Sequence, residues 1–560
     1  MEPQSLFEVD ASDLPLPTSL QVAVQHGEVF TRRWIVETIL NMVGYKDDLD
    51  LADMRIVEPA CGQGAFLIPI AARLSASCRS RGRSLLDASA AILAFDLLER
   101  NIQQTRAALT EQLLSDGWSA QDVQRVIHSW VRQGDFLLQE SSPGTADFVV
   151  GNPPYIRLED VPDERMRAYR QACPSMQGRA DIYIGFYDAG LRKLRHGGKL
   201  GFICADRWMR NQYGRALRQL VTRGYSMDLV LTMHDVDAFE EQVSAYPAIT
   251  VISRGAQGTA VAADATGAFD AEAARGFGKW VTESGEHLVK ASSYHAARLP
   301  HWFPGEDSWP AASPARLAML EDLSDRFPLL EEETTGTRVG IGVATGADKV
   351  FITRDPSTAE PDRLLPLAMV RDTTSGKLDW GGTYLVDPWD EQGQLVDLNA
   401  YPKLATYFAQ HRPALAKRYI AVKQPARWYK TIDKVDHRLA QRPKLLLPDM
   451  KLTIHPVLDE GGLYPHHNLY YIVSDAWDMR VLGGLLLSKV AEAFVEAYAV
   501  KMRGGTLRFQ AQYLRKIRVP DPADMREEDR GALAGAFEMR DVRAATEAAL
   551  RAYGLDELPD

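Results

Sequence analysis

The feature of this sequence that most restricts its fold is an alternation of short apolar runs with longer helical patterns between residues 54 and 252. Strands that alternate with helices build a mostly parallel sheet, because a parallel connection needs a crossover long enough to hold a helix. The expected strands are Met54–Val57, Ala91–Phe95, Asp147–Val150, Lys199–Ile203, Leu229–Leu231 and Ala248–Ile252. Helices are expected over Arg33–Val43 and Ile182–Leu194. The pattern therefore predicts an α/β fold for this part of the chain.

The whole chain is too long for one hydrophobic core. Its 560 residues correspond to several domains of roughly 100–200 residues each. We predict a first domain over 1–255, a connecting region over 256–335, a second domain of mixed strands and helices over 336–520, and a helical segment over 521–560. The connecting region is rich in Ala, Gly, Asp and Glu, whereas the last segment has helical periodicity.

The composition is that of a folded globular chain, with 46% hydrophobic and 25% charged residues. No apolar run reaches the roughly 18–20 residues that cross a bilayer, and the first residues lack the pattern of a signal peptide. We therefore expect a cytoplasmic protein without membrane segments. The four cysteines form no Cys-x-x-Cys pair, which argues against a zinc site or a redox dithiol.

Charge is segregated along the chain. The formal net charge of −11 argues by itself against a polyanionic partner. Residues 401–520, however, hold 20 Lys and Arg against 9 Asp and Glu, and Tyr419, Trp428 and Tyr429 lie among them. A second basic cluster spans Lys501–Arg508. Such segments are typical of surfaces that bind nucleic acid, because Lys and Arg neutralise phosphates, although ordinary solvated faces also carry them.

A glycine turn follows the first expected strand, in the segment Glu58-Pro59-Ala60-Cys61-Gly62-Gln63-Gly64-Ala65-Phe66. Gly62 and Gly64 have no side chain, so a cofactor can approach the backbone at the carboxyl edge of the sheet. Asp96 closes the second strand, where its carboxylate can accept hydrogen bonds from ribose hydroxyls. Gly134-Asp135-Phe136 offers a carboxylate and a ring to an adenine. Each feature alone also fits a tight loop or a solvated strand end, but three in order suit an adenosine-containing cofactor.

The tetrapeptide Asn152-Pro153-Pro154-Tyr155 ends the next strand and is the most specific local signal in the chain. The two prolines fix φ and remove two N–H donors, so the carbonyls there can only accept hydrogen bonds. A rigid strand-exit turn is the alternative interpretation of the same residues.

In this order, the segments resemble the amino-methyltransferases that modify exocyclic nitrogens of DNA bases. The segments are His26–Thr31, Glu58–Phe66, Asp96, Gly134–Phe136, Asn152–Tyr155, Asp181–Tyr183, Gly197–Ile203 and Phe239–Ala245. Because the segment ending in Thr31 precedes the glycine turn, the order is that of the gamma class. The pattern is similar to TaqI-like N6-adenine methyltransferases of restriction-modification or phage-defence systems.

The resemblance implies a Rossmann-like, S-adenosylmethionine-dependent methyltransferase domain over 1–255 and an α+β target-recognition domain, which binds DNA, over 336–520. Arg338–Phe351 resembles the start of such a recognition domain and Arg503–Pro520 its end. The cofactor contacts implied are Val29, Thr31, Glu58, Ala60, Cys61, Gly62, Gly64, Asp96, Asp135, Phe136 and Asn152. The residues implied to hold and activate the target base are Asn152, Pro153, Pro154, Tyr155 and Phe239.

Three positions depart from the family pattern. Arg32 stands in place of a usual proline, Glu58 in place of a common aspartate, and Gln63 in place of a serine. None of them removes a group that the chemistry needs, so they affect fine contacts and leave the predicted class unchanged.

These residues suit methylation of an amine. The N6 lone pair of adenine is delocalised into the ring, and acceptors at Asn152 and Pro153 draw its hydrogens out of plane. The base must first rotate out of the duplex, and Tyr155 and Phe239 would then pack against it. A C5-cytosine mechanism needs a thiol after a proline, but here the pair is reversed, Cys173-Pro174. N4-cytosine chemistry uses the same fold, with serine more often at position 152, so adenine is favoured.

Two rival functions remain open at this point: an RNA or protein-glutamine N-methyltransferase, and a DNA-recognition subunit of a defence complex. The partner expected in the main hypothesis is double-stranded DNA, and a restriction nuclease or other defence subunit would be a separate polypeptide. His455, His466 and His467 match no ligand spacing, so no metal site is predicted.

Overall fold

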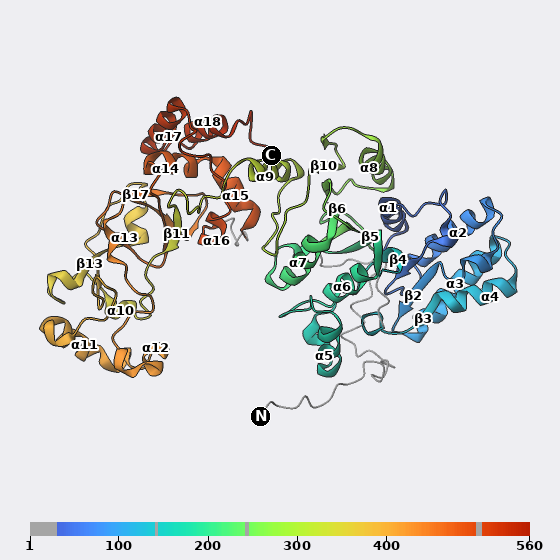
Figure 1. Cartoon of the computed structure of the whole chain (residues 1–560), viewed down its shortest axis with the longest axis horizontal. Coiled ribbons are helices and arrows are strands. Elements are labelled where there is room, and N and C mark those ends of the chain that lie inside the picture. Colours follow the sequence, from blue (N-terminus) through green and yellow to red (C-terminus); the bar gives the residue numbers. More distant parts are fainter. Residues whose placement is uncertain (1–30, 140–143, 241–245, 500–506) are drawn as a thin grey trace. The chain divides into compact units, whose positions relative to one another are not determined.

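The computed structural model describes residues 31–139, 144–240, 246–499 and 507–560. The chain divides into two compact units, Met1–Ala318 and Met319–Asp560, which Figure 1 colours from blue to yellow-green and from yellow-green to red. Every helix in the described ranges is too short or too polar to span a bilayer.

A ten-stranded sheet forms the centre of the first unit. Its strands are β1 Ile56–Glu58, β2 Ile92–Asp96, β3 Val131–Gln133, β4 Ala146–Gly151, β5 Leu194–Ala205, β6 Tyr225–Thr232, β7 Pro247–Arg254, β8 Ala260–Ala265, β9 Leu288–Lys290 and β10 Tyr294–Leu299. They lie in the order β3-β2-β1-β4-β5-β7-β6-β8-β10-β9. The first five of this order are parallel, and β7 is antiparallel to both of its neighbours.

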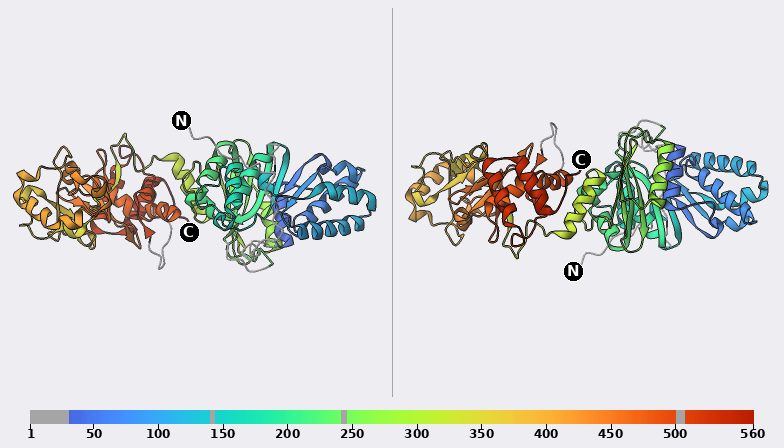
Figure 2. Two further views of the ribbon diagram at one scale, coloured as in Figure 1. Left: turned by 90° about the horizontal axis from the view of Figure 1, so that it is seen from below. Right: turned by 90° about the horizontal axis from the view of Figure 1, so that it is seen from above.

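Helices cover both faces of this sheet (Figure 2). They are α1 Arg33–Val43, α2 Leu67–Ser80, α3 Glu99–Ser115, α4 Ala120–Trp130, α5 Asp163–Ala172, α6 Tyr183–Lys193, α7 Arg215–Gly224 and α8 Ala271–Glu283. A further helix, α9 Pro314–Arg326, contains the boundary between the two units. Alternate residues of a strand point to opposite faces, so Ile56 packs in one core and Val57 in the other. Residues of α1 to α4 and α8 also belong to the core around Ile56, whereas residues of α5 to α7 belong to the core around Val57.

Helix α1 positions the start of the described chain. Its residues Ile35, Ile39 and Leu40 are fully buried, and each contributes roughly 1.5–3 kcal/mol by leaving water. The helix ends at Gly44, whose φ of 84° lies in the left-handed region that favours glycine. Because α1 begins at Arg33, its packing also fixes the neighbouring Thr31.

The α/β fold is confirmed, and the local periodicity placed most elements correctly. The six expected strands are found as β1, β2, β4, β5, β6 and β7, and the two expected helices as α1 and α6. In the region 256–335, which the sequence indicates to be peripheral elements or a connection, β8, β9 and β10 extend one edge of the sheet. Strand β8, Ala-Val-Ala-Ala-Asp-Ala, has little intrinsic strand preference, and its pairing with β6 and β10 determines its conformation.

The direction in which strands are added to the sheet reverses between β1 and β4. Strands β2 and β3 lie on one side of β1, whereas β4 and then β5 lie on its other side. Helix α2, after β1, packs on one face, whereas α6, after β4, packs on the other. Ligands of open α/β sheets bind at such a reversal, outside the carboxyl ends of the strands.

The second unit mixes short strands with helices, as expected for an α+β domain. Its strands are β11 Arg338–Ile341, β12 Ile352–Thr353, β13 Leu364–Ala368, β14 Tyr384–Val386, β15 Lys444–Pro448, β16 Met450–Lys451, β17 Val457–Asp459, β18 Tyr464–Pro465, β19 Leu469–Val473 and β20 Leu507–Arg508. Its helices are α10 Asp348–Phe351, α11 Pro402–Leu415, α12 Tyr419–Lys423, α13 His437–Gln441, α14 Met479–Leu487, α15 Lys489–Tyr498, α16 Ala511–Leu514, α17 Glu527–Met539 and α18 Val542–Tyr553. The last two form the helical segment expected at the end of the chain (Figure 1).

Candidate active site

The glycine turn joins the ends of β1 and β2. The Cys61 N–H donates to the Phe95 carbonyl over 2.8 Å, and the Gly62 N–H donates to Asp96 Oδ2 over 2.9 Å. Gly62 has a φ of 49°, in the left-handed region, and a Cβ placed there would meet no described atom within 4 Å. The turn therefore needs glycine for its backbone and leaves open space beside it.

Asp96 is held by several donors. Its Oδ1 accepts from the Leu98 N–H at 2.8 Å and from Asn101 Nδ2 at 3.1 Å, in addition to the bond from Gly62. The hydroxyl of Thr105 donates to the Gly62 carbonyl over 2.8 Å and ties helix α3 to the same turn. These bonds fix the carboxylate at the carboxyl end of β2, where the sequence predicted it.

Glu58 ends β1 and is 2% exposed. Its Oε2 is buried and has no hydrogen-bond partner in the described part of the chain. Burial, and then the nearby Asp96, raise the pKa of Glu58 well above its ordinary value. A buried carboxyl group without a partner is unfavourable, so this position suits a cationic group of a ligand.

Asp135 has partners that the sequence did not reveal. Arg165 Nη1 lies 2.6 Å and the Tyr169 hydroxyl 2.7 Å from Asp135 Oδ2, and both belong to α5. The Leu137 N–H donates to the other oxygen over 3.2 Å. Burial raises the pKa of Asp135, although Tyr169 and Arg165 act in the opposite direction. The spacing of Arg165 and Tyr169, four residues on one helix, was the only signal that they act together.

Phe136 lies in the core beside Asp135. Its ring stacks on Phe186 with centroids 5.9 Å apart and tilts against Phe95 at 5.8 Å. The predicted contact of this ring with an adenine stays a prediction.

The Asn-Pro-Pro-Tyr segment starts next to the glycine turn. Strands β1 and β4 are parallel, with Val57 opposite Val149, so both strands end at the same edge. A Cβ on Gly151 would lie 3.6 Å from Pro59 and 3.8 Å from Glu58. The two motifs, 90 residues apart in the sequence, are therefore adjacent in space, as the proposed chemistry requires.

Three distant segments meet beside this tetrapeptide. Thr31 forms an isolated antiparallel bridge with Phe239, and the Asn152 side-chain Nδ2 donates to Thr31 Oγ1 over 3.2 Å. The Tyr155 ring contacts Phe239 edge to face, with centroids 6.4 Å apart. Burial, with Cys204 and Tyr187 nearby, raises the pKa of Tyr155 well above its ordinary value, so the hydroxyl stays protonated.

Of the other predicted site residues, some lie in the described ranges and some lie outside them. Ala60 is half-buried, Cys61 is buried, and burial followed by Glu58 raises the pKa of the Cys61 thiol. Pro153 is buried and Pro154 half-buried. Two parts of the matching segments lie outside the described residues: 26–30, which include Val29, and 241–245.

Known proteins with similar sequences give the family. Residues 71–239 match the profile of the Eco57I restriction-modification methylases. Over 94% of this chain, the sequence is 44% identical to the type II methyltransferase M.PaeR7I of Pseudomonas aeruginosa, of which 92% is covered. The chain belongs to the type II DNA methyltransferases. This DNA methyltransferase is also 41% identical to M.XhoI of Xanthomonas vasicola, over 95% of this chain and 98% of that protein.

One solved structure is similar to this chain over most of its length. The type IIG restriction endonuclease BpuSI is 13% identical to this DNA methyltransferase, with a TM-score of 0.41, and the match covers 92% of this chain and 61% of that one. The family membership confirms the resemblance found in the sequence and does not favour a methyltransferase of RNA or protein.

The basic segment of the methyltransferase's second unit is only partly available to a partner. The guanidinium of Arg418 donates to the carbonyls of Thr345, Trp428 and Lys430, and Lys444 is fully buried. Between residues 401 and 444, the exposed basic residues are Lys403, Arg412, Lys417, Lys423, Arg427, Lys434 and Arg438. These seven side chains are the candidates for phosphate contacts.

Proposed function

We propose that this DNA methyltransferase transfers a methyl group from S-adenosylmethionine to N6 of an adenine turned out of double-stranded DNA. The observation that carries the proposal is the meeting of Thr31, the Asn152–Tyr155 segment and Phe239 beside the glycine turn. This arrangement places groups for binding an amine and a flat base next to groups for binding a cofactor.

The residues at the turn fit S-adenosylmethionine. The cofactor carries an ammonium and a sulfonium, and the buried Oε2 of Glu58 has no partner among the described residues. The open space beside Gly62 admits a ligand against the backbone. Asp96 would then hold the ribose, and Asp135 the adenine amino group. When bound, the cofactor supplies an electrophilic methyl group.

Asn152 and Pro153 act on the amine that attacks this methyl. The Asn152 amide nitrogen is directed toward Thr31, which turns its oxygen to the other side of the amide. That oxygen and the Pro153 carbonyl accept the two hydrogens of the exocyclic amine and localise its lone pair. Because displacement is in line, holding the nitrogen and the methyl carbon in position lowers the barrier, and acceptors near the developing positive charge lower it further.

Tyr155 and Phe239 hold the flipped base. Rotation of a base out of the duplex costs a few kcal/mol, and stacking on an aromatic ring returns ~1–3 kcal/mol. The two rings stand edge to face, 80° apart, so one can cover the base plane while the other meets its edge. Thr31, bonded to Asn152 and bridged to Phe239, sets the distance between the amine site and the rings.

The second unit would recognise the DNA target, and its exposed basic residues would contact phosphates. N4 of cytosine is the second candidate acceptor, because the same acceptors suit any exocyclic amine; Asn152, where N4-cytosine enzymes more often have serine, favours adenine. We further propose that a matching restriction nuclease is a separate polypeptide, since relatives covered over more than nine-tenths of their length are named as methyltransferases alone.

The test is transfer of labelled methyl from S-adenosylmethionine to duplex DNA, followed by separation of the nucleosides. We expect all label in N6-methyldeoxyadenosine, and none with Asn152→Ala, which should still fold and bind cofactor. Label in N4-methyldeoxycytidine would assign cytosine as the target. Label only in RNA or protein, or DNA binding without transfer, would overturn the proposal in favour of the two rival functions.

A further inference from the structure

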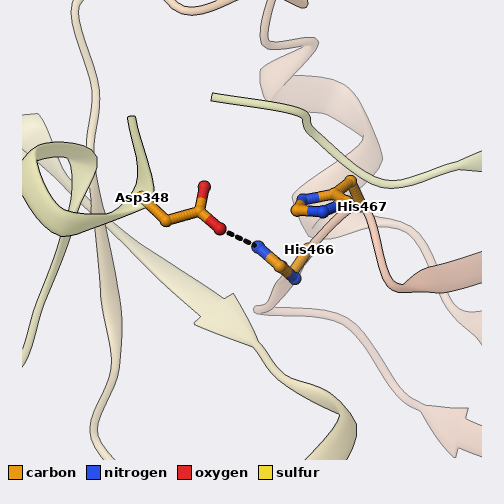
Figure 3. A group of neighbouring side chains, drawn as sticks. All are labelled: Asp348, His466 and His467. Carbon is orange, nitrogen blue, oxygen red and sulfur yellow. Dashed lines mark hydrogen bonds and ion pairs between the residues drawn. The ribbon is translucent and has the colours of Figure 1, made fainter. Parts of the chain in front are cut away.

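The second unit contains a cluster of two histidines and one aspartate that the methyl-transfer site does not use. Asp348 is the first residue of α10, and His466 and His467 lie between β18 and β19. One ligand-type atom from each residue lies within 4.8 Å of the others, and Figure 3 shows the three side chains gathered at one point. The aspartate is 118 residues from His466 in the sequence.

We propose that Asp348, His466 and His467 bind a divalent transition-metal ion of the zinc type. This inference does not depend on the proposed methylation of adenine. Two imidazoles and one carboxylate are a donor set that suits zinc, whereas calcium and magnesium prefer oxygen ligands alone. A water molecule would complete four-fold coordination.

The distances are close to those that zinc needs. Ligand bonds of ~2.0–2.2 Å in a tetrahedral site place neighbouring ligand atoms about 3.3–3.6 Å apart. His466 Nε2 and Asp348 Oδ2 are 3.3 Å apart, so this edge of the site already has the required length. The third ligand, from His467, needs a shift of no more than ~1.5 Å, and its ring lies 4.0 Å from that of His466.

The backbone holds these residues in place. The His466 N–H donates to the Ala368 carbonyl, and the His467 N–H donates to the Val343 carbonyl, each over 3.1 Å. The Thr345 hydroxyl donates to Asp348 Oδ1 over 2.5 Å, which leaves Oδ2 directed at His466. Two segments far apart in the sequence are therefore fixed against each other before any ion binds.

Both ring nitrogens of His466 form hydrogen bonds, one of them between Nε2 and Asp348 Oδ2. His466 Nδ1 accepts a bond of 3.5 Å, the limit of a hydrogen bond, from the Asn468 N–H, and this weak bond is lost when Nε2 binds an ion and the ring proton lies on Nδ1.

An unpartnered nitrogen also points to a ligand. His467 Nδ1 is buried and has no hydrogen-bond partner among the described residues. Such a nitrogen is unfavourable in the interior, and coordination would satisfy it. Asp348 has a side chain that is 45% exposed, so an ion and its water can reach the cluster from solvent.

A second histidine–aspartate pair provides a matched control. His437 Nε2 lies 2.6 Å from Asp387 Oδ2 in the same unit. The described residues bring no third ligand to this pair within the same limits. It therefore has the same two groups as the proposed site without the arrangement that an ion needs.

The experiment measures zinc bound to the full chain, prepared without a histidine tag, stripped with a chelator, dialysed against Zn²⁺ and freed of unbound ion. We expect about one zinc per chain in the wild type and in His437→Gln. Affinity should fall at least tenfold in His467→Ala and in Asp348→Asn, together with loss of the zinc-dependent rise in Tm. Less than a tenth of an ion per wild-type chain, or equal binding in all four proteins, would overturn the proposal.

Discussion

We propose that Glu58 links cofactor binding to pH. In the free protein its pKa is raised, so the carboxyl group keeps its proton above the ordinary pH range of a glutamate. A cation bound beside it favours the ionised form and lowers that pKa again. Binding then releases a proton, and a ligand that does so binds more tightly as pH rises.

We therefore predict that the affinity for S-adenosylmethionine increases with pH up to the raised pKa of Glu58 and is constant above it. The increase is at most about tenfold per pH unit. Calorimetry in two buffers of different ionisation enthalpy measures the released proton directly. Glu58→Gln should release none, and an unchanged pH profile in that variant would contradict the assignment.

Tyr155 should act on the base and not on the cofactor. Its ring contacts Phe239, and its side chain takes no part in the hydrogen bond between Gly62 and Asp96 at the glycine turn. We predict that Tyr155→Ala lowers methyl transfer by about 5- to 150-fold, from the loss of ~1–3 kcal/mol of stacking, with cofactor affinity unchanged. Fluorescence of 2-aminopurine at the target position reports base flipping, and Tyr155→Phe is the control that keeps the ring. Equal losses of cofactor affinity and rate would refute this role.

At the scale of elements, α5 is anchored to the predicted adenine site. Both Arg165 and Tyr169 reach the Asp135 carboxylate from this helix, so the helix orients a group that we propose binds the cofactor.

We predict that Tyr169→Phe, which removes one of these bonds, weakens cofactor binding about 3- to 10-fold, or ~0.7–1.4 kcal/mol. The fold should be retained. Tyr213→Phe is the matched control, because the Tyr213 hydroxyl bonds Tyr183, at 2.7 Å, and not Asp135. Equilibrium binding of S-adenosylmethionine to the two variants tests this prediction. Equal affinities would show that α5 does not orient Asp135 for cofactor binding.

The pairing of β15 with β17 contains a buried ion pair. Lys444 and Asp459 are opposite each other in the register, with Nζ and Oδ2 2.8 Å apart and side chains 0% and 3% exposed. Burial lowers the pKa of Lys444, although Asp459 opposes that effect. Neither charge is stable there without the other.

We predict that Lys444→Met lowers the free energy of unfolding of the second unit by ~3–5 kcal/mol, because Asp459 is left charged and buried. Adding Asp459→Leu to the same chain should restore most of the loss. Urea denaturation followed in the second unit measures both, and a double variant as unstable as the single one would contradict this explanation.

At the scale of the whole molecule, the sequence alone predicted those helices and strands that local residue patterns determine. The α1 bounds and the strands β1, β2 and β4 follow from periodicity and turn residues, and the order of the motifs indicated their neighbourhood. Strand β8 was missed because Ala-rich strands form only through pairing. Arg165 and the Asp348–His466 contact were missed because helix packing and a separation of 118 residues determine them.

The segregated charge has a consequence for DNA binding. Each phosphate contact adds about −0.9 to the slope of log K against log salt. We predict that Lys417→Ala and Lys423→Ala each reduce that slope by about 1 and weaken binding similarly for all DNA sequences. Arg543→Ala, at a salt-bridged position of α18, is the control. A slope unaffected by the two lysines would place the phosphate contacts elsewhere.

The reversal of strand order between β1 and β4 separates two tasks along the chain. Everything that we assign to the methyl donor, except Val29, Thr31 and Asn152, lies on β1 to β3 and their loops, whereas the proposed acceptor residues follow β4 and β6. A change in which nucleobase is modified can therefore arise on one side without disturbing the donor. Over evolutionary time, such a sheet can acquire new targets while its alkylating chemistry stays the same.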